Sequence, residues 1–99
     1  MATISITNTA EPTLDELIRS RIHFMLGSSI ASLKIVEVNV ERSVQPGQDS
    51  EIVRCDLRVL EIGGKWHLVS TRQRNLTSAV EGSLTRLRRS LRRHRQYRM

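Results

Sequence analysis

The segment NLTSAVEGSLTRLRRSLRRHRQYRM, residues 75–99, decides the fold because it holds the clearest helical pattern in the chain. Its apolar residues recur at steps of three and four, and at about 100° per residue they fall within an arc of roughly 80°. They are Leu76, Val80, Leu84, Leu87 and Leu91. Asn75 is a favourable N-cap, since its side-chain oxygen can accept a hydrogen bond from an amide of the first turn. The pattern predicts a long amphipathic helix with one narrow side packed on a core.

Arginines flank this apolar stripe on both sides. Arg86, Arg89 and Arg93 lie on one flank, and Arg88, Arg92 and Arg95 lie on the other. Residues 82–99 hold seven arginines and no acid, whereas residues 1–81 hold nine Lys/Arg against ten Asp/Glu. A helix that is merely solvated usually mixes lysine with glutamate. The excess therefore points to a polyanionic partner, and guanidinium groups suit bidentate phosphate contacts and stacking on bases.

Length and composition are those of one globular domain. A chain of 99 residues, 38% hydrophobic, is long enough for a two-layer core. No apolar run approaches the roughly 20 residues of a membrane-spanning helix, and the N-terminus lacks a signal-peptide pattern. We expect a cytoplasmic protein, monomeric in solution and without a membrane partner. The single cysteine, Cys55, excludes an internal disulfide and lies in an alternating strand pattern, which predicts a buried thiol.

The first half of the chain shows strand and helix patterns in turn. Residues 2–7 alternate and predict a short strand, and the sequence TLDE at 13–16 is typical of a capping box. A helical apolar stripe follows and ends at Gly27. Its members are Leu14, Leu17, Ile18, Ile22 and Met25. Period-two patterns then predict strands over 33–41 and 51–61, with a polar loop at 45–50 between them.

The second half predicts a hairpin followed by the final helix. Gly63 and Gly64 can take the positive φ of a tight turn, and residues 65–71 return as a strand with Trp66 and Leu68 on one face. The order β-α-β-β-β-α predicts an α+β fold, a two-layer sandwich in which two helices cover one face of a four-stranded sheet. Leu84 and Leu87 should then lie against the strand residues Val38, Cys55 and Leu57.

No catalytic or metal-binding pattern occurs in the sequence. The three histidines, His23, His67 and His94, lie on different predicted elements, and Cys55 has no CxxC partner. The glycine pair lacks the Lys-Ser/Thr and the helix that complete a phosphate loop. We therefore expect no enzyme activity, no cofactor, no metal and no small-molecule substrate.

Arginines of the last helix are the leading candidates for contact with RNA. The chain has only three aromatic residues, and charged residues alternate along its central strands. This favours recognition of RNA backbone and shape over base-by-base reading on the sheet. The candidate set lies on the last helix, with secondary positions beside its start and on the first helix: Arg86, Arg88, Arg89, Arg92, Arg93, Arg95, Arg74, Arg72 and Arg19. Two alternatives use the same basic helix: a DNA- or protein-binding transcriptional modulator, and non-specific adhesion to an anionic membrane.

The element order and particular residues resemble the bacterial ribosome hibernation-promoting factor family, also known as ribosome-associated translation inhibitors and sigma-factor modulation proteins. Residues 75–81, NLTSAVE, resemble the Asp-Leu-Tyr-Ala-Ala-Ile-Asp opening of the family's second helix. Leu87 and Leu91 stand where the family repeats leucine before a basic tail. Residues 36–40 and the strand around Arg54 and Cys55 resemble the family's second and third strands.

The resemblance implies a protein that docks on the small ribosomal subunit, in the channel for mRNA and tRNA, during slow growth or stress. Its partners would be rRNA and neighbouring ribosomal proteins. Residues 1–94 would form the ribosome-binding domain and 95–99 a basic tail, as in the family's short form. Residues 41–50 lack the family's Asp…Asn-Gly…Gly-Gly pattern, and Arg42 stands near the expected aspartate.

Overall fold

The order of helices and strands is the one that the sequence predicts. A computed structural model describes residues 2–44, 47 and 51–97, the last four in their backbone only. The strands are β1 (Thr3–Asn8), β2 (Leu33–Val44), β3 (Glu51–Glu61) and β4 (Trp66–Gln73). The helices are α1 (Asp15–Leu26) and α2 (Leu76–Tyr97), with short 3-10 helices η1 (Pro12–Leu14) and η2 (Gly27–Ser32) on either side of α1. Apart from Gly47, the predicted loop at 45–50 lies outside the described residues.

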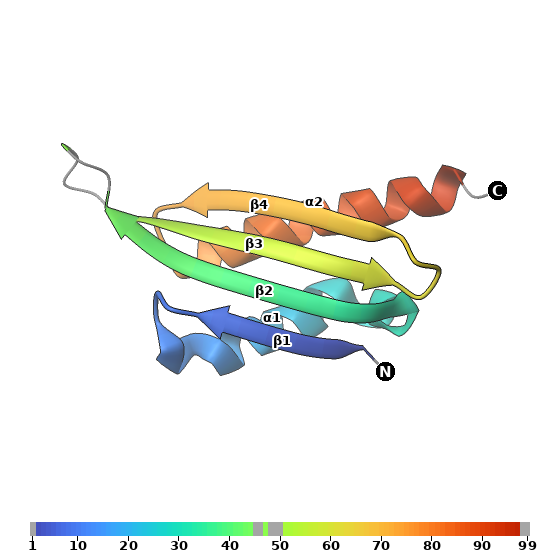
Figure 1. Cartoon of the computed structure of the whole chain (residues 1–99), viewed down its shortest axis with the longest axis horizontal. Helices are drawn as coiled ribbons and strands as arrows, with labels where there is room; N and C mark the ends of the chain where they lie inside the picture. Colours follow the sequence, from blue (N-terminus) through green and yellow to red (C-terminus); the bar gives the residue numbers. More distant parts are fainter. Residues whose placement is uncertain (1, 45–46, 48–50, 98–99) are drawn as a thin grey trace.

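The four strands form one sheet in the order β1-β2-β3-β4. β1 pairs with β2 in parallel, through the α1 crossover, and the other two pairings are antiparallel. Figure 1 shows both helices behind the sheet, α1 along β1 and β2 and α2 along β3 and β4, with α2 extending past the sheet. This confirms the predicted α+β two-layer sandwich. β1 and β4 point the same way. Each helix runs back along the sheet after the strand that precedes it, so α1 and α2 also run in the same direction.

The core lies between the sheet and the two helices. The predicted stripe of α2 supplies it in full, whereas in the predicted stripe of α1 only Ile18 and Ile22 are buried, and Leu26, which the pattern did not include, takes the place of Met25. All five stripe residues of α2 are buried, together with Ile18, Ile22 and Leu26 of α1. The alternate strand residues predicted to face inward are buried as well: Val36, Val38, Val40, Val53, Cys55, Leu57 and Val59. Leu84 and Leu87 belong to the same hydrophobic cluster as Val38, Cys55 and Leu57, as the sequence predicts.

Buried polar contacts join α2 to the strands beside its apolar stripe. The Ser83 hydroxyl donates to the carbonyl oxygen of Cys55 at 3.1 Å. Ser90 Oγ lies 2.7 Å from His67 Nδ1, and the other ring nitrogen of His67 lies 3.4 Å from the Glu61 carboxylate. At its start, α2 is capped by Asn75, whose Oδ1 accepts from the amide of Ser78 at 2.8 Å, as predicted. These directional contacts set the rotation of α2 about its axis.

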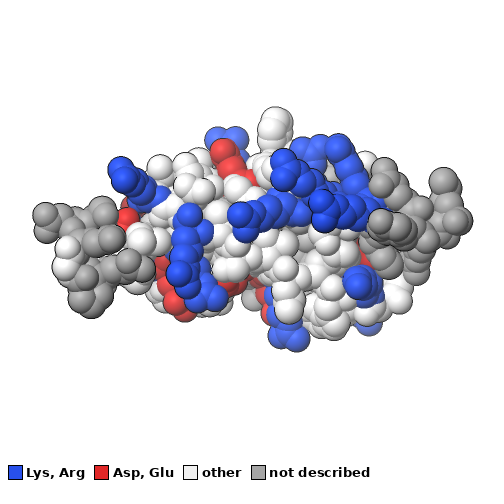
Figure 2. Space-filling model, turned by 90° about the horizontal axis from the view of Figure 1, so that it is seen from above, with Lys and Arg blue, Asp and Glu red and all other residues white. Residues whose placement is uncertain are grey.

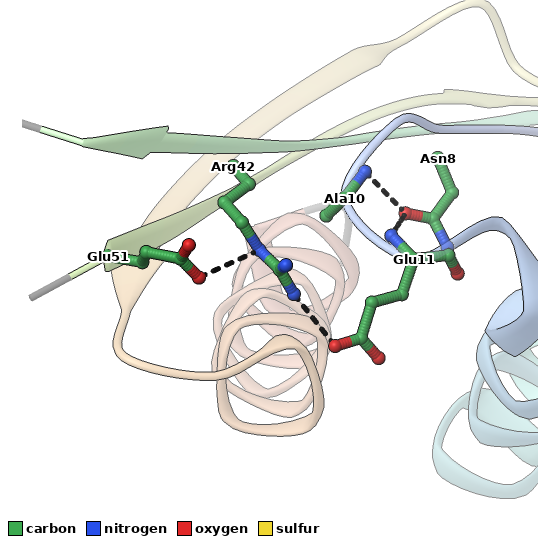
Figure 3. Close-up of polar contacts among 5 residues, drawn as sticks. All are labelled: Asn8, Ala10, Glu11, Arg42 and Glu51. Atoms are coloured by element: carbon green, nitrogen blue, oxygen red, sulfur yellow. Dashed lines mark hydrogen bonds and ion pairs between the residues drawn. The ribbon is translucent and has the colours of Figure 1, made fainter.

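The predicted capping box at the start of α1 is wrong. No side chain caps either η1 or α1, because Pro12 begins a 3-10 turn ahead of the α-helix. Asn8 orders this connection instead (Figure 3). Its Oδ1 accepts from the amides of Ala10 and Glu11 at 3.1 and 3.0 Å. Its Nδ2 donates to the carbonyl oxygen of Glu11 at 2.6 Å and to the Asp15 carboxylate at 3.1 Å.

Trp66 and Leu68 share one face of β4, as predicted, and that face is the open one. The side chain of Leu68 is 73% exposed, whereas His67 is buried under α2. Arg58, on the neighbouring strand, stacks over the Trp66 ring at 4.4 Å from its centroid. The hairpin that sets this register turns through Gly64, whose φ is +97°, and closes with a bond from the Glu61 amide to the Lys65 carbonyl.

Replacing Leu87 with alanine tests the docking of α2. The side chain is completely buried, so Leu87→Ala should lower the free energy of unfolding by about 2–5 kcal/mol. Urea denaturation followed by circular dichroism measures this loss. The matched control is Leu68→Ala on the open sheet face, which should change the free energy by less than about 0.5 kcal/mol. Similar losses for the two variants would contradict the packing of α2 described above.

Candidate nucleic-acid interface

The outer surface of α2 carries two rows of exposed arginines, one on each side of the buried stripe. Arg86, Arg89 and Arg93 form the row on the β4 side, and Arg88 and Arg92 form the row on the α1 side. Arg86 donates to the carbonyl oxygen of Ser70 on β4 at 3.0 Å. Arg88 and Arg92 share a pocket with the end of α1. Figure 2 shows Lys and Arg side chains gathered in a patch beside the C-terminal end of the molecule. We call Arg86, Arg88, Arg89, Arg92 and Arg93 the arginine rows.

No carboxylate neutralises the arginine rows within the part of the chain whose side chains are described. The ion pairs there involve arginines of other elements, such as Arg21 with Glu81 at 3.4 Å and Arg58 with Glu37 at 3.8 Å. Several arginines in the rest of the domain thus have a carboxylate partner, whereas the described arginines of α2 have none. An unneutralised cationic surface attracts a polyanion, and its arginines can each hold a phosphate through two hydrogen bonds.

The remaining sequence candidates lie elsewhere. Arg72 is exposed on β4 and alternates with the buried Thr71, so it lies on the open sheet face, paired in register with Arg54. Arg19 lies on α1, 3.9 Å from Glu16. Arg74 is exposed in the connection between β4 and α2. The side chain of Arg95 lies outside the described residues. The structure therefore brings together five of the nine candidates and places Arg72 on the opposite face.

Arg42 on β2 is held by two carboxylates (Figure 3). Its guanidinium lies 2.7 Å from Glu11 and 3.2 Å from Glu51. These ion pairs tie the connection after β1 to β2 and to the start of β3. Because both partners are partly exposed, the pairs contribute only modestly to stability. They nevertheless neutralise Arg42, which makes it a structural tether and a poor candidate for phosphate binding.

Phe24 is a candidate that our reading of the sequence missed. Its side chain is 80% exposed on α1. It borders a pocket of about 410 Å³ between the end of α1, the start of η2 and α2. The signal was present in the sequence, because on a helical wheel Phe24 falls opposite Ile18, Ile22 and Leu26, the residues that α1 buries. An aromatic residue on the polar side of a helix is unusual, and this feature identifies Phe24 as a candidate binding residue.

The one cysteine and the arrangement of possible metal ligands bear on covalent and metal chemistry. Burial raises the pKa of the Cys55 thiol from 9.0 to about 11, so the thiol stays protonated at neutral pH and is a poor nucleophile. In the described part of the chain, no three side chains of the His, Cys, Asp or Glu type come together as metal ligands. Neither α1 nor α2, as far as each is described, combines the length and hydropathy needed to cross a membrane.

The raised pKa of Cys55 predicts a loss of stability at high pH. The unfolded thiol ionises near pH 9, while the folded one keeps its proton until about pH 11. Stability is therefore complete below pH 9 and should fall by roughly 3 kcal/mol as the pH rises through 11. Urea titrations of the wild type and Cys55→Ala across this range measure the effect, since other alkaline titrations are common to both proteins. If the two proteins lose the same free energy between pH 8.5 and 11.5, Cys55 makes no such contribution.

Comparison with known proteins finds likeness in structure and none in sequence. No protein-family model and no curated protein sequence matches the chain. A solved structure described as a ribosomal subunit interface protein from Coxiella burnetii superposes with a TM-score of 0.74. The match covers 94% of this chain and 97% of that chain, at 14% sequence identity. At so low an identity, the comparison shows that the two chains share a fold.

Proposed function

We propose that this protein is a ribosome-associated, rRNA-binding translation inhibitor of the hibernation-promoting factor family. It docks on the small ribosomal subunit and silences it during slow growth or stress. The observation that carries the proposal is the pair of arginine rows on α2, exposed and without a described counter-ion. The fold shared with a ribosomal subunit interface protein supports it, as does the family resemblance of residues 75–81.

Two rows on opposite sides of one helix fit a groove between RNA elements better than a flat duplex surface. Arg89 faces away from the buried stripe and lines one space with Arg88 and Arg92. The two rows together therefore wrap the exposed side of α2, and a single flat surface would contact only part of this arc. A groove can bring phosphates to both flanks at once. The arginine rows lie where α2 packs on the sheet through the buried Leu87 and Leu91, and only the end of the helix extends past the strands (Figure 1). A groove would therefore receive the outer side of α2, with the sheet behind it.

Inhibition would then follow from occupancy. A folded domain seated in the channel for mRNA and tRNA excludes both by volume, and no chemical step is required. The affinity would come chiefly from release of counterions by the RNA phosphates. Residues 1–94 act in this proposal as the docking domain. Arg95 continues the sequence pattern of the α1-side row, and residues 95–99 extend its charge.

The salt dependence of binding tests where the affinity resides. If about five phosphates are neutralised, log affinity for ribosomal subunits should fall against log salt with a slope of roughly −3.5 to −4.5. Changing Arg88, Arg89, Arg92 and Arg93 together to glutamine should make that slope shallower by about 2–4. Folding should be nearly unchanged, because all four side chains are exposed. Sedimentation with purified subunits at several salt concentrations measures both quantities.

The control removes the same number of charges from other positions, by changing Lys34, Arg54, Arg58 and Lys65 to glutamine. These substitutions should leave the slope nearly intact. If the control substitutions weaken binding to ribosomal subunits more than the α2 substitutions do, the proposed interface lies on the wrong side of the molecule. If the wild type stays at the top of a low-salt gradient, away from ribosomal particles, the ribosomal function is wrong. Retention on DNA in that case would favour the transcriptional alternative.

A further inference from the structure

The pocket beside Phe24 adds a feature that the arginine rows do not explain. One wall comes from the last turn of α1 and from η2, and the other from α2. Its volume of about 410 Å³ falls within the roughly 300–1,000 Å³ typical of small-molecule sites. The residues that matter below are Phe24, Ser28, Arg88, Leu91 and Arg92. The pocket therefore combines one exposed aromatic ring with two guanidinium groups.

Phe24 is the described aromatic ring that is open to stacking. The other described aromatic residue on the surface, Trp66, already has Arg58 over its ring at 4.4 Å. At 80% exposure, the Phe24 ring contributes little to the core and holds apolar surface in water. A partner that covered the ring would recover that hydrophobic free energy.

The charges around the pocket would orient a nucleotide within it. Arg88 and Arg92 lie on the α2 wall and attract phosphate. The opposite wall is the C-terminal end of α1, where the helix dipole is negative and favours hydrogen-bond donors. A nucleotide would place its phosphate on α2 and an exocyclic amino group towards the end of α1, with the base against Phe24. The hydroxyl of Ser28 lies on the same wall and can bind a base edge.

A second, smaller space continues the path along α2. It measures about 120 Å³ and is lined by Thr85, Arg88, Arg89 and Arg92. Arg88 and Arg92 line both spaces, so an RNA backbone that follows the α1-side row passes from one to the other. Bases inside a duplex are stacked and cannot enter a pocket of this size, whereas a bulged or looped-out base can.

From these observations we propose that the pocket binds one unpaired RNA nucleotide, with its base stacked on Phe24 and its phosphate held by Arg88 and Arg92. The inference rests on the proposed function, because it places RNA along α2. It adds a contact that distinguishes unpaired from paired RNA, which the arginine rows alone do not. The protein would therefore prefer rRNA sites where a nucleotide is bulged out next to a groove.

Two RNA hairpins of equal length, one fully paired and one with a single bulged nucleotide, test this preference. Fluorescence anisotropy gives the affinity of each for the wild type and for Phe24→Leu. Losing the ring should weaken binding of the bulged hairpin about 5- to 150-fold, the range expected for one base–aromatic stack. Binding of the paired hairpin should change less than about twofold. Phe24→Tyr should keep the preference, and ultraviolet cross-linking of the bulged hairpin should map to Phe24.

Leu68→Ala, which alters an exposed apolar residue on the open sheet face, is the matched control and should leave both affinities unchanged. If the wild type sediments with ribosomal subunits but Phe24→Leu binds the bulged hairpin as well as the wild type does, the nucleotide site is refuted and the proposed function stands. Loss of subunit binding by Phe24→Leu without loss of RNA affinity would instead assign the pocket to a ribosomal protein. A wild type that binds neither subunits nor RNA overturns both proposals.

Discussion

The docking of α2 on β3 and β4 is the interaction on which the rest of the structure depends. Its apolar stripe and the inward residues of the central strands form one hydrophobic cluster, and in a small domain that burial is a large share of total stability. Ser83 and Ser90 add directional contacts to Cys55 and His67. At Gly82 the helix comes so near to β4 that an added Cβ would lie 3.1 Å from Thr71. Such close packing holds the rotation of α2, and that rotation sets which way every arginine points.

The same helix carries a charge density that opposes its own stability. Arginines spaced three and four residues apart repel one another on a helix surface. Two features offset part of this repulsion. The arginines lie towards the C-terminal end of α2, where the dipole favours cations, and Arg88 and Arg92 lie beside the C-terminal end of α1, which is also negative. Because the two helices run in the same direction, their negative ends lie at the same end of the molecule, which is also the end that carries the arginine rows. A phosphate ligand would remove the remaining repulsion.

The packed core and the arginine rows together present a surface suited to binding a polyanion. The buried Cys55 thiol is held protonated, and the ion pairs of Arg42 tie down the connection between β1 and α1. The helical side exposes, among other groups, guanidinium surface, one phenyl ring and the pocket between them. Those are the groups that contact phosphates and unpaired bases.

Local pattern was enough to determine the main helices and strands, their order and the buried faces of α2 and the central strands, but it gave the buried face of α1 only in part. The stripe of α2 and the alternation of β3 are long and regular, so their periods leave one solution. The start of α1 could not be read in this way, because the side chain that orders it, Asn8, belongs to the preceding strand. The sequence showed Phe24 as an aromatic residue on the polar side of its helix, but not that it borders a pocket. Only tertiary packing brings the end of α1 beside Arg88 and Arg92, and it also places Arg72 on the far face of the sheet. Local propensity acts over a few residues, whereas a pocket between two helices depends on how each is seated on the sheet.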